Sequence, residues 1–184
     1  MRKRSTEELG RISPEAFRLT EKNPVMVVLD NIRSMHNVGS VFRTADAFLA
    51  EGICLCGYTP QPPHRDIHKT ALGATDTVQW NYFPSAMEAI TSLKQQGYAL
   101  YAVEQAEGSI PLGAFTPAHQ KIAVIFGNEV EGVNARLLEH CDGCIEIPQF
   151  GTKHSLNISV AAGIVLWEMA KNFARGGAGA RRSE

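Results

Sequence analysis

No stretch of this sequence is apolar for long enough to cross a membrane. The longest apolar segment, near residues 158–167, contains Ser159 and stops at Glu168. It is well short of the ~20 residues that a membrane-spanning helix needs. The basic residues at positions 2–4 are not followed by an apolar segment, so a secretory signal is not expected. We therefore expect a cytoplasmic protein.

The chain also lacks an excess of either charge, because its formal net charge is −1. No global positive field marks it as a nucleic-acid-binding protein. The basic residues that stand out lie towards the two ends: Arg2, Lys3, Arg4, Arg11, Arg18, Lys171, Arg175, Arg181 and Arg182. These residues either hold a phosphate backbone or are solvated charges on frayed ends. Composition favours neither interpretation.

Cysteine is scarce, at four residues. Cys54 and Cys56 alternate in a strand-like run, which places both on one face and suits a core. Cys141 and Cys144 have the spacing of half a zinc site or of a redox pair. Cys54 and Cys56 are too close together to form the second half of such a zinc site. We therefore favour reduced, buried thiols and predict no metal.

Two nucleotide-binding fingerprints are absent. The segment Phe126-Gly-Asn-Glu-Val-Glu-Gly132 follows an apolar run and holds two glycines. Their spacing is not that of the dinucleotide motif G-x-G-x-x-G, and no Gly-Lys-Ser/Thr of a Walker motif follows. An NAD-linked dehydrogenase is therefore a poor match. Taken alone, the segment is a plain turn or a loop that lines a binding site.

What is present is an alternation of apolar runs with helical patterns. The runs predict strands at 25–30, 52–58, 98–103, 121–126 and 143–147, and the patterns predict helices at 38–50, 84–96, 133–140 and 156–173. Residues 1–23 are expected to form a polar arm or short helix, and 59–76 an irregular excursion. Strands that alternate with helices predict an α/β fold with a mainly parallel sheet flanked by helices.

Three strand-to-helix junctions are rich in polar residues. In parallel sheets, ligands bind where the carboxyl ends of strands meet the following loops. In the first junction, at 30–43, Asn37 is expected to cap the helix. Arg43, near the helix start, offers a planar fork for phosphate or forms a surface salt bridge. The second junction is the glycine-containing segment 126–132. The third, Phe150-Gly-Thr-Lys-His-Ser-Leu-Asn-Ile-Ser159, has far more hydrogen-bonding side chains than a helix start needs.

Together the junctions resemble a known family. Asn37…Arg43, then Gly127-Asn128-Glu129…Gly132, then Ile147-Pro148…Ser155-Leu156-Asn157 closely resemble the three motifs of the SpoU (TrmH-like) RNA methyltransferases, within the SPOUT superfamily. The resemblance runs from about residue 25 to residue 173. Gln149 stands where the family often has methionine, and the substrate-binding extensions of larger members are missing or short.

The resemblance implies S-adenosylmethionine-dependent methylation of a ribose 2′-hydroxyl in tRNA or rRNA. It also implies a C-terminal deep trefoil knot and an obligate homodimer. The implied catalytic residues are Arg43, Asn37, Glu129, Ser155 and Asn157, and the implied cofactor-binding residues are Val103, Gly127, Ile147, Ser155 and Leu156. The alternative is a knotted protein that binds RNA without methylating it.

The resemblance divides the chain into a short basic arm at 1–23, a methyltransferase domain at 24–175 and a flexible basic tail at 176–184. The third junction then becomes the last knot loop, which lines a cofactor pocket as well as starting a helix. This double role accounts for its many polar side chains.

Two further expectations come from the residues themselves. Arginine is a poor base because its pKa exceeds about 12, so Arg43 is better suited to orienting a substrate phosphate. His36 is an alternative proton acceptor or a solvent-exposed loop histidine. In the helix expected at 156–173, apolar residues cover nearly the whole circumference. Such a helix must be covered on both sides, so we expect a second subunit to cover one of them.

Overall fold

The structure, a computed structural model, describes residues 1–5, 8, 10–117 and 120–177. The helices are α1 (Pro14–Leu19), α2 (Met35–Ala47), α3 (Arg65–Ala71), α4 (Ala86–Gln95), α5 (Ala135–Leu138) and α6 (Ile158–Gly177), with two 3-10 helices, η2 (Ala74–Asp76) and η3 (Leu112–Ala114). The strands are β1 (Asn23–Asp30), β2 (Ala50–Cys56), β3 (Gln79–Phe83), β4 (Ala99–Val103), β5 (Ile110–Pro111), β6 (Ile122–Phe126) and β7 (Gly143–Glu146).

The strands form one sheet in the order β3-β2-β1-β6-β4-β7-β5. Every neighbouring pair is parallel. Helices connect most of the strands, as parallel pairs require. The predicted α/β fold with a mainly parallel sheet is therefore confirmed.

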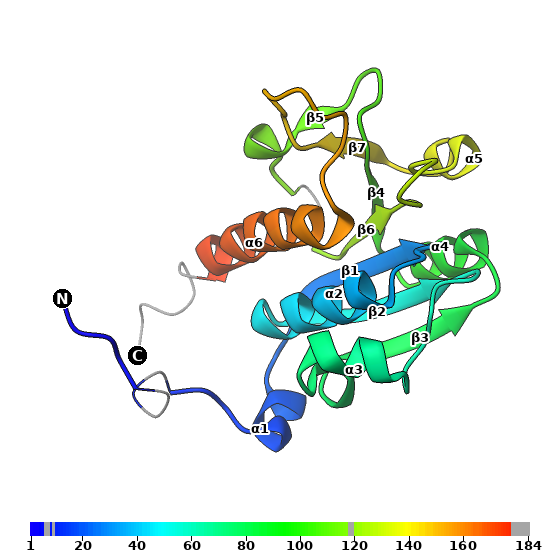
Figure 1. The fold of residues 1–184 in the computed structure, drawn as a ribbon. Coiled ribbons are helices and arrows are strands. Elements are labelled where there is room, and N and C mark those ends of the chain that lie inside the picture. The colour runs from blue at the N-terminus through cyan, green and yellow to red at the C-terminus, as the bar shows by residue number, and fades with distance from the viewer. Residues whose placement is uncertain (6–7, 9, 118–119, 178–184) are drawn as a thin grey trace.

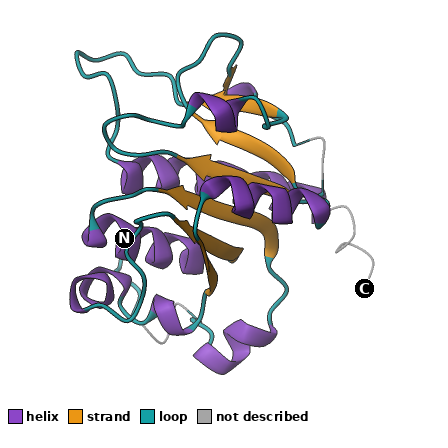
Figure 2. Cartoon of the chain, turned by 90° about the vertical axis from the view of Figure 1, so that its right-hand side faces the viewer, coloured by secondary structure: helices purple, strands orange, loops and turns teal. Residues whose placement is uncertain are grey.

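Helices cover both faces of the sheet. Along β1, Val25, Val27 and Leu29 belong to one buried cluster and Met26 and Val28 to the other, because successive side chains of a strand point to opposite faces. The first cluster includes side chains of α2, α3 and α6, and the second includes side chains of α4 and α5. Figure 1 shows α2 and α6 side by side over one face, and Figure 2 shows the strands between the helices.

Several predicted boundaries need correction. Helix α2 begins at Met35, and its cap is Ser34, whose hydroxyl accepts a hydrogen bond from the backbone N–H of Asn37. Asn37 is therefore inside the helix, and Arg43 lies in its second half rather than near its start. The earlier start releases the Asn37 side chain from capping.

The segment at 59–76 is not the irregular excursion that its prolines suggested. It contains α3 and η2. His64 caps α3 by accepting a hydrogen bond from the backbone N–H of Asp66, and Ile67 and Ala71 are buried. Strands β3 and β5 were also missed. Their side chains are mostly exposed or half-buried, so they lack the apolar runs of central strands.

The cysteine prediction holds in part. Cys54 and Cys56 are buried, whereas Cys141 and Cys144 are only half-buried, and all four are free thiols. Burial raises the pKa of the Cys54 thiol to about 12 and that of Cys141 to about 11. Within the described part of the chain, no group of histidine, cysteine and carboxylate side chains has a metal-binding arrangement.

The short helix α1 falls within the predicted arm. Of the predicted tail, residues 176–177 belong to α6, and 178–184 lie outside the described residues. Among the helices in the described ranges, none is both long and apolar enough to span a membrane.

Candidate active site

The three polar junctions meet at one edge of the sheet. Strands β1 and β6 are neighbours, and the chain proceeds from them in opposite directions across the sheet. Such a switch point leaves a crevice beyond the carboxyl ends of the two strands. The loop after β1 carries Asn31–Ser34, and the loop after β6 carries Gly127–Glu129. The segment that leads into α6 reaches the same place, as its hydrogen bonds show.

Glu129 holds the first two junctions together. One carboxylate oxygen, Oε2, accepts the backbone N–H of Arg33 at 3.1 Å. The other, Oε1, accepts the backbone N–H of Ser34 at 3.3 Å and the side-chain amide of Asn37 at 3.3 Å. A residue after β6 therefore fixes the start of α2.

Asn157 joins the third junction to this pair. Its Nδ2 donates to Oδ1 of Asn37 at 3.1 Å. Its Oδ1 accepts the backbone N–H of Ser159 at 2.8 Å, at the start of α6. Two side-chain hydrogen bonds thus form a network. One links Asn37 to Glu129, 92 positions away in sequence, and the other links Asn37 to Asn157, 120 positions away. The structure brings these three predicted residues together.

The electrostatics of Glu129 follow from these contacts. Partial burial tends to raise the pKa of its carboxyl group. The N–H groups of Arg33, Ser34 and Asn37 bind the charged form and outweigh burial, so the pKa lies below its usual value. The carboxylate is consequently ionised at neutral pH.

This contact predicts a pH-dependent contribution to stability. A depressed pKa stabilises the folded state above the unfolded pKa, and that contribution is lost as pH falls through the folded pKa. Glu129→Gln should therefore lower the free energy of unfolding near pH 7 by about 1 kcal/mol or less, since solvent screens the exposed part of the group. Urea unfolding at about pH 7 and about pH 3 should show that the difference in the free energy of unfolding between the parent and Glu129→Gln disappears in acid. Glu131→Gln, at an exposed neighbouring carboxylate, is the control. A gap of the same size at both pH values would contradict the assignment.

A cleft of about 680 Å³ lies beside this network. The five residues predicted to bind a cofactor all line it: Val103, Gly127, Ile147, Ser155 and Leu156. Glu129 and Asn157 line it as well. Its volume is within the range of small-molecule sites. The ends of β4, β6 and β7 therefore build the cleft together with the segment before α6.

Gly127 allows the β6 loop to fold back on itself. A Cβ atom at this position would lie 2.1 Å from the backbone carbon and oxygen of Gly132. Asn128 and Gly132 form an isolated antiparallel bridge at the same point. A side chain at Gly127 would thus disturb the loop before it reached a ligand in the cleft.

Arg43 and His36 lie apart from the cleft. Both are exposed, and they are seven positions apart on α2, so they project from nearly the same side of the helix. No described residue forms a hydrogen bond or ion pair with the Arg43 guanidinium, which argues against the surface salt bridge. Neither residue lines the cleft.

Three residues that shape the site were not among the predicted catalytic or cofactor-binding residues. Glu104, after β4, accepts the backbone N–H of Val133 at 2.9 Å and so holds the far end of the β6 loop. Asn128 donates to the backbone oxygen of Asn31 at 2.8 Å. Gln105 donates to the backbone oxygen of His154 at 2.8 Å. This hydrogen bond links the residues that follow β4 to the segment before α6. Each contact spans a long stretch of sequence, so no local pattern reveals it.

Comparison with known proteins agrees with this geometry. The model of the SpoU rRNA Methylase family matches residues 24–167, most of the chain. The chain belongs to the SpoU rRNA methylase family. The match includes all the residues that form the Glu129–Asn37–Asn157 network and the cleft.

Relatives within and around the family show what the chain is similar to. The 23S rRNA (guanosine-2′-O-)-methyltransferase RlmB of Neisseria meningitidis is 32% identical over 145 residues, which cover 79% of this chain and 57% of that protein. The AdoMet-bound rRNA methyltransferase of Sinorhizobium meliloti has a TM-score of 0.77 at 28% identity, covering 88% of this chain and 61% of that one. The TrmH/SpoU tRNA modifying enzyme of A. aeolicus shares the fold, with a TM-score of 0.80 at 24% identity, covering 92% of this chain and 87% of that one. The chain thus spans little more than half of the Neisseria relative.

Proposed function

We propose that this protein transfers a methyl group from S-adenosylmethionine to a ribose 2′-hydroxyl of tRNA or rRNA. The observation that carries the proposal is the meeting of Glu129, Asn37 and Asn157 beside one cleft. Relatives that are named rRNA 2′-O-methyltransferases support the reaction. An AdoMet-bound structural relative supports the cofactor. We also infer that the protein acts in the cytoplasm, and that its methyltransferase domain covers residues 24–175.

The cleft fits the proposed cofactor in chemistry as well as size. When bound, S-adenosylmethionine supplies an electrophilic methyl group on a positively charged sulfonium. Glu104, Glu129 and Glu131 bring carboxylates to the cleft, and negative charge favours a cationic ligand. Val103, Ile147 and Leu156 give it apolar walls, as small-molecule sites require.

The chain's own residues would then position the acceptor. We infer that Arg43 binds an RNA phosphate through its planar guanidinium and stabilises negative charge that develops on the ribose oxygen. Hydrogen bonds among Glu129, Asn37 and Asn157 hold the three junctions together. Ser155 is exposed and lines the cleft, and we infer that it contacts the cofactor and the substrate. His36, exposed on the same helix, is the less favoured alternative, as acceptor of the hydroxyl proton.

We further infer the deep trefoil knot in the C-terminal half. After β7 the chain runs past the loop that follows β4, where Gln105 binds His154, before α6 packs against α2 and β1. A chain that passes through the connection between β4 and β6 on this path is knotted. A crystal structure traced without a break from β4 to α6 tests the inference. A trace that passes around the loop rather than through it would overturn the knot.

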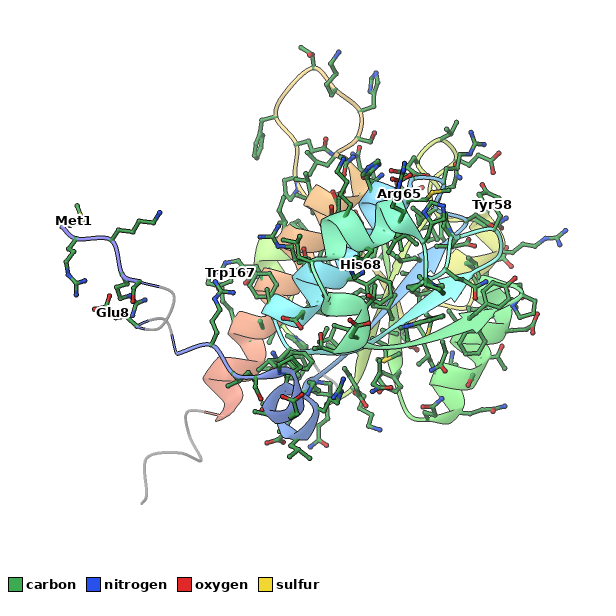
Figure 3. The ribbon with its side chains drawn as sticks, turned by 60° about the horizontal axis from the view of Figure 1, so that its bottom comes forward. Met1, Glu8, Tyr58, Arg65, His68 and Trp167 are labelled. Carbon is green, nitrogen blue, oxygen red and sulfur yellow. The ribbon has the colours of Figure 1, made fainter. Side chains whose placement is uncertain are left out.

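We also infer a homodimer built on α6. One side of α6 is buried against the core through Ile158, Ala162, Val165, Leu166 and Met169. The opposite stripe keeps three apolar side chains exposed: Val160 at 50%, Ile164 at 38% and Trp167 at 55%. Figure 3 shows Trp167 at the outer flank of this helix. A continuous apolar stripe of this kind suits a second copy of the chain.

Filling the cleft should weaken cofactor binding. Ser155→Trp places a large ring at the lining, so the Kd for S-adenosylmethionine should rise at least about tenfold, equivalent to about 1.4 kcal/mol. Lys153→Trp puts the same ring at an exposed position of the same segment that does not line the cleft, and it should leave the Kd unchanged. Titration calorimetry measures both. Equal affinities in the two variants would place the cofactor elsewhere.

A further inference from the structure

Tyr58 is an exposed aromatic ring that is held at both ends. It follows β2 by two residues, at the carboxyl edge of the sheet where the candidate active site lies. Its backbone N–H donates to Oδ1 of Asn31 at 3.2 Å, and its phenol oxygen accepts from Nδ2 of Asn128 at 2.7 Å. The side chain is nevertheless 57% exposed, and Figure 3 shows it at the margin of the molecule.

The backbone before Tyr58 is shaped for this contact. Gly57 has a φ of +62°, and a Cβ there would lie 2.1 Å from Oδ1 of Asn31. Glycine therefore permits the close approach that lets Asn31 receive the Tyr58 N–H. Asn31 itself adopts a left-handed φ of 56°, which asparagine tolerates better than most residues.

The Asn128 amide fixes the direction of the Tyr58 hydroxyl. Oδ1 of Asn128 accepts hydrogen bonds from the backbone N–H groups of Val130 at 2.8 Å and Glu131 at 3.2 Å. Its Nδ2 must therefore be the atom that faces Tyr58, so the phenol oxygen is the acceptor. The phenol proton is left to donate outward. The result is a ring that is held at its hydroxyl, is largely exposed and keeps a free donor.

This ring lies next to the candidate active site. Asn128 immediately precedes Glu129, whose carboxylate binds Arg33, Ser34 and Asn37. Arg33 also carries an exposed guanidinium, for which the described residues provide no ion-pair partner. Tyr58 and Arg33 thus both adjoin the Glu129 network, Tyr58 through Asn128 and Arg33 through its backbone N–H.

We propose that Tyr58 is a stacking platform for a base of the RNA substrate. The inference rests on the proposed function and names how the substrate is held. Single-stranded RNA is recognised largely by bases that stack on aromatic side chains. A ring that is already immobilised loses little conformational entropy on binding. Arg33 can pair with a phosphate of the same strand, which adds affinity without sequence preference.

Binding of a defined oligonucleotide tests the platform. The probe is a single-stranded oligoadenylate about twelve nucleotides long, compared with an abasic oligomer of the same length and charge. Tyr58→Leu should weaken oligoadenylate binding about tenfold, within the range of loss of one base stack, and leave abasic binding unchanged. Tyr58→Phe keeps the ring and should bind within about threefold of the parent. Tyr82→Leu, at an exposed tyrosine on β3, should bind as the parent does.

Two results would overturn the platform. One is oligoadenylate binding by Tyr58→Leu that equals the parent. The other is a loss in Tyr58→Phe as large as in Tyr58→Leu, because Tyr58 would then act only by holding Asn128. Calorimetry with S-adenosylmethionine in each variant shows whether the cleft is intact. Methyl transfer by the parent is measured in a separate assay. If the parent transferred no methyl group, the proposed function would be wrong, whereas the Tyr58 contact is judged from the binding measurements alone.

Discussion

Arg43→Lys is expected to lower the rate of methyl transfer by about a hundredfold or more, while the affinity for S-adenosylmethionine stays unchanged. The magnitude is that typical of removing one donor aimed at charge that develops in a transition state. Lysine keeps the positive charge but not the planar pair of N–H donors that grips a phosphate. Because Arg43 is exposed and does not line the cleft, the substitution should spare both the fold and the cofactor site.

Single-turnover assays with labelled S-adenosylmethionine measure the effect. Arg136→Lys makes the same exchange at an exposed arginine on α5 and should retain full activity. His36→Ala should cause only a modest loss. A rate for Arg43→Lys within about twofold of the parent would remove Arg43 from the catalytic group. A collapse in His36→Ala, with loss of the alkaline rise of the pH–rate profile, would make His36 the base.

The second large effect is expected on α6. Ile164→Arg should convert the proposed dimer to a monomer and abolish methyl transfer, because it places a charge in the centre of the exposed stripe between Val160 and Trp167. An unpaired charge buried in an interface costs several kcal/mol. Arg43 lies on α2, which packs beside α6, so the partner of the stripe would also cover the surroundings of Arg43.

Sedimentation at low micromolar concentration follows the assembly state. Leu19→Arg is the matched control, since Leu19 is an exposed apolar residue on α1, away from α6. It should remain a dimer with normal activity. A parent chain that is monomeric and still methylates RNA would refute the dimer, and so would an Ile164→Arg dimer of normal activity.

The sequence predicts the central elements well because their signals are local. The buried strands β1, β4 and β6 are continuous apolar runs, and Gly97 marks the end of α4. Where the prediction of an element or its boundary fails, the failure has a physical cause. Two capping residues compete at the start of α2, where Ser34 lies three positions before Asn37. The prolines at 60–63 hide a helix that begins only at Arg65. Edge strands such as β3 are exposed or half-buried, so they carry no continuous apolar run by which they could be recognised.

The site divides in the same way. The motif residues Asn37, Glu129 and Asn157 were found from the resemblance, and tertiary structure shows that they bond to one another. Glu104, Asn128 and Tyr58 were not found as contacts, because their partners come from other strands. Local composition cannot reveal such residues, because each acts through a partner that is distant in sequence, either a backbone N–H or a side chain that follows another strand.

The most direct test of the central claim is where a labelled methyl group goes. Parent protein is incubated with methyl-labelled S-adenosylmethionine and total RNA from cells that lack this gene, and the RNA is digested to nucleosides and resolved by mass spectrometry. Arg43→Lys is the control for contaminating activity. We expect label in a 2′-O-methylated nucleoside of tRNA or rRNA with the parent protein and almost none with the variant. Label confined to methylated bases, or no label from a parent protein that binds both cofactor and RNA, would contradict the proposed ribose methylation.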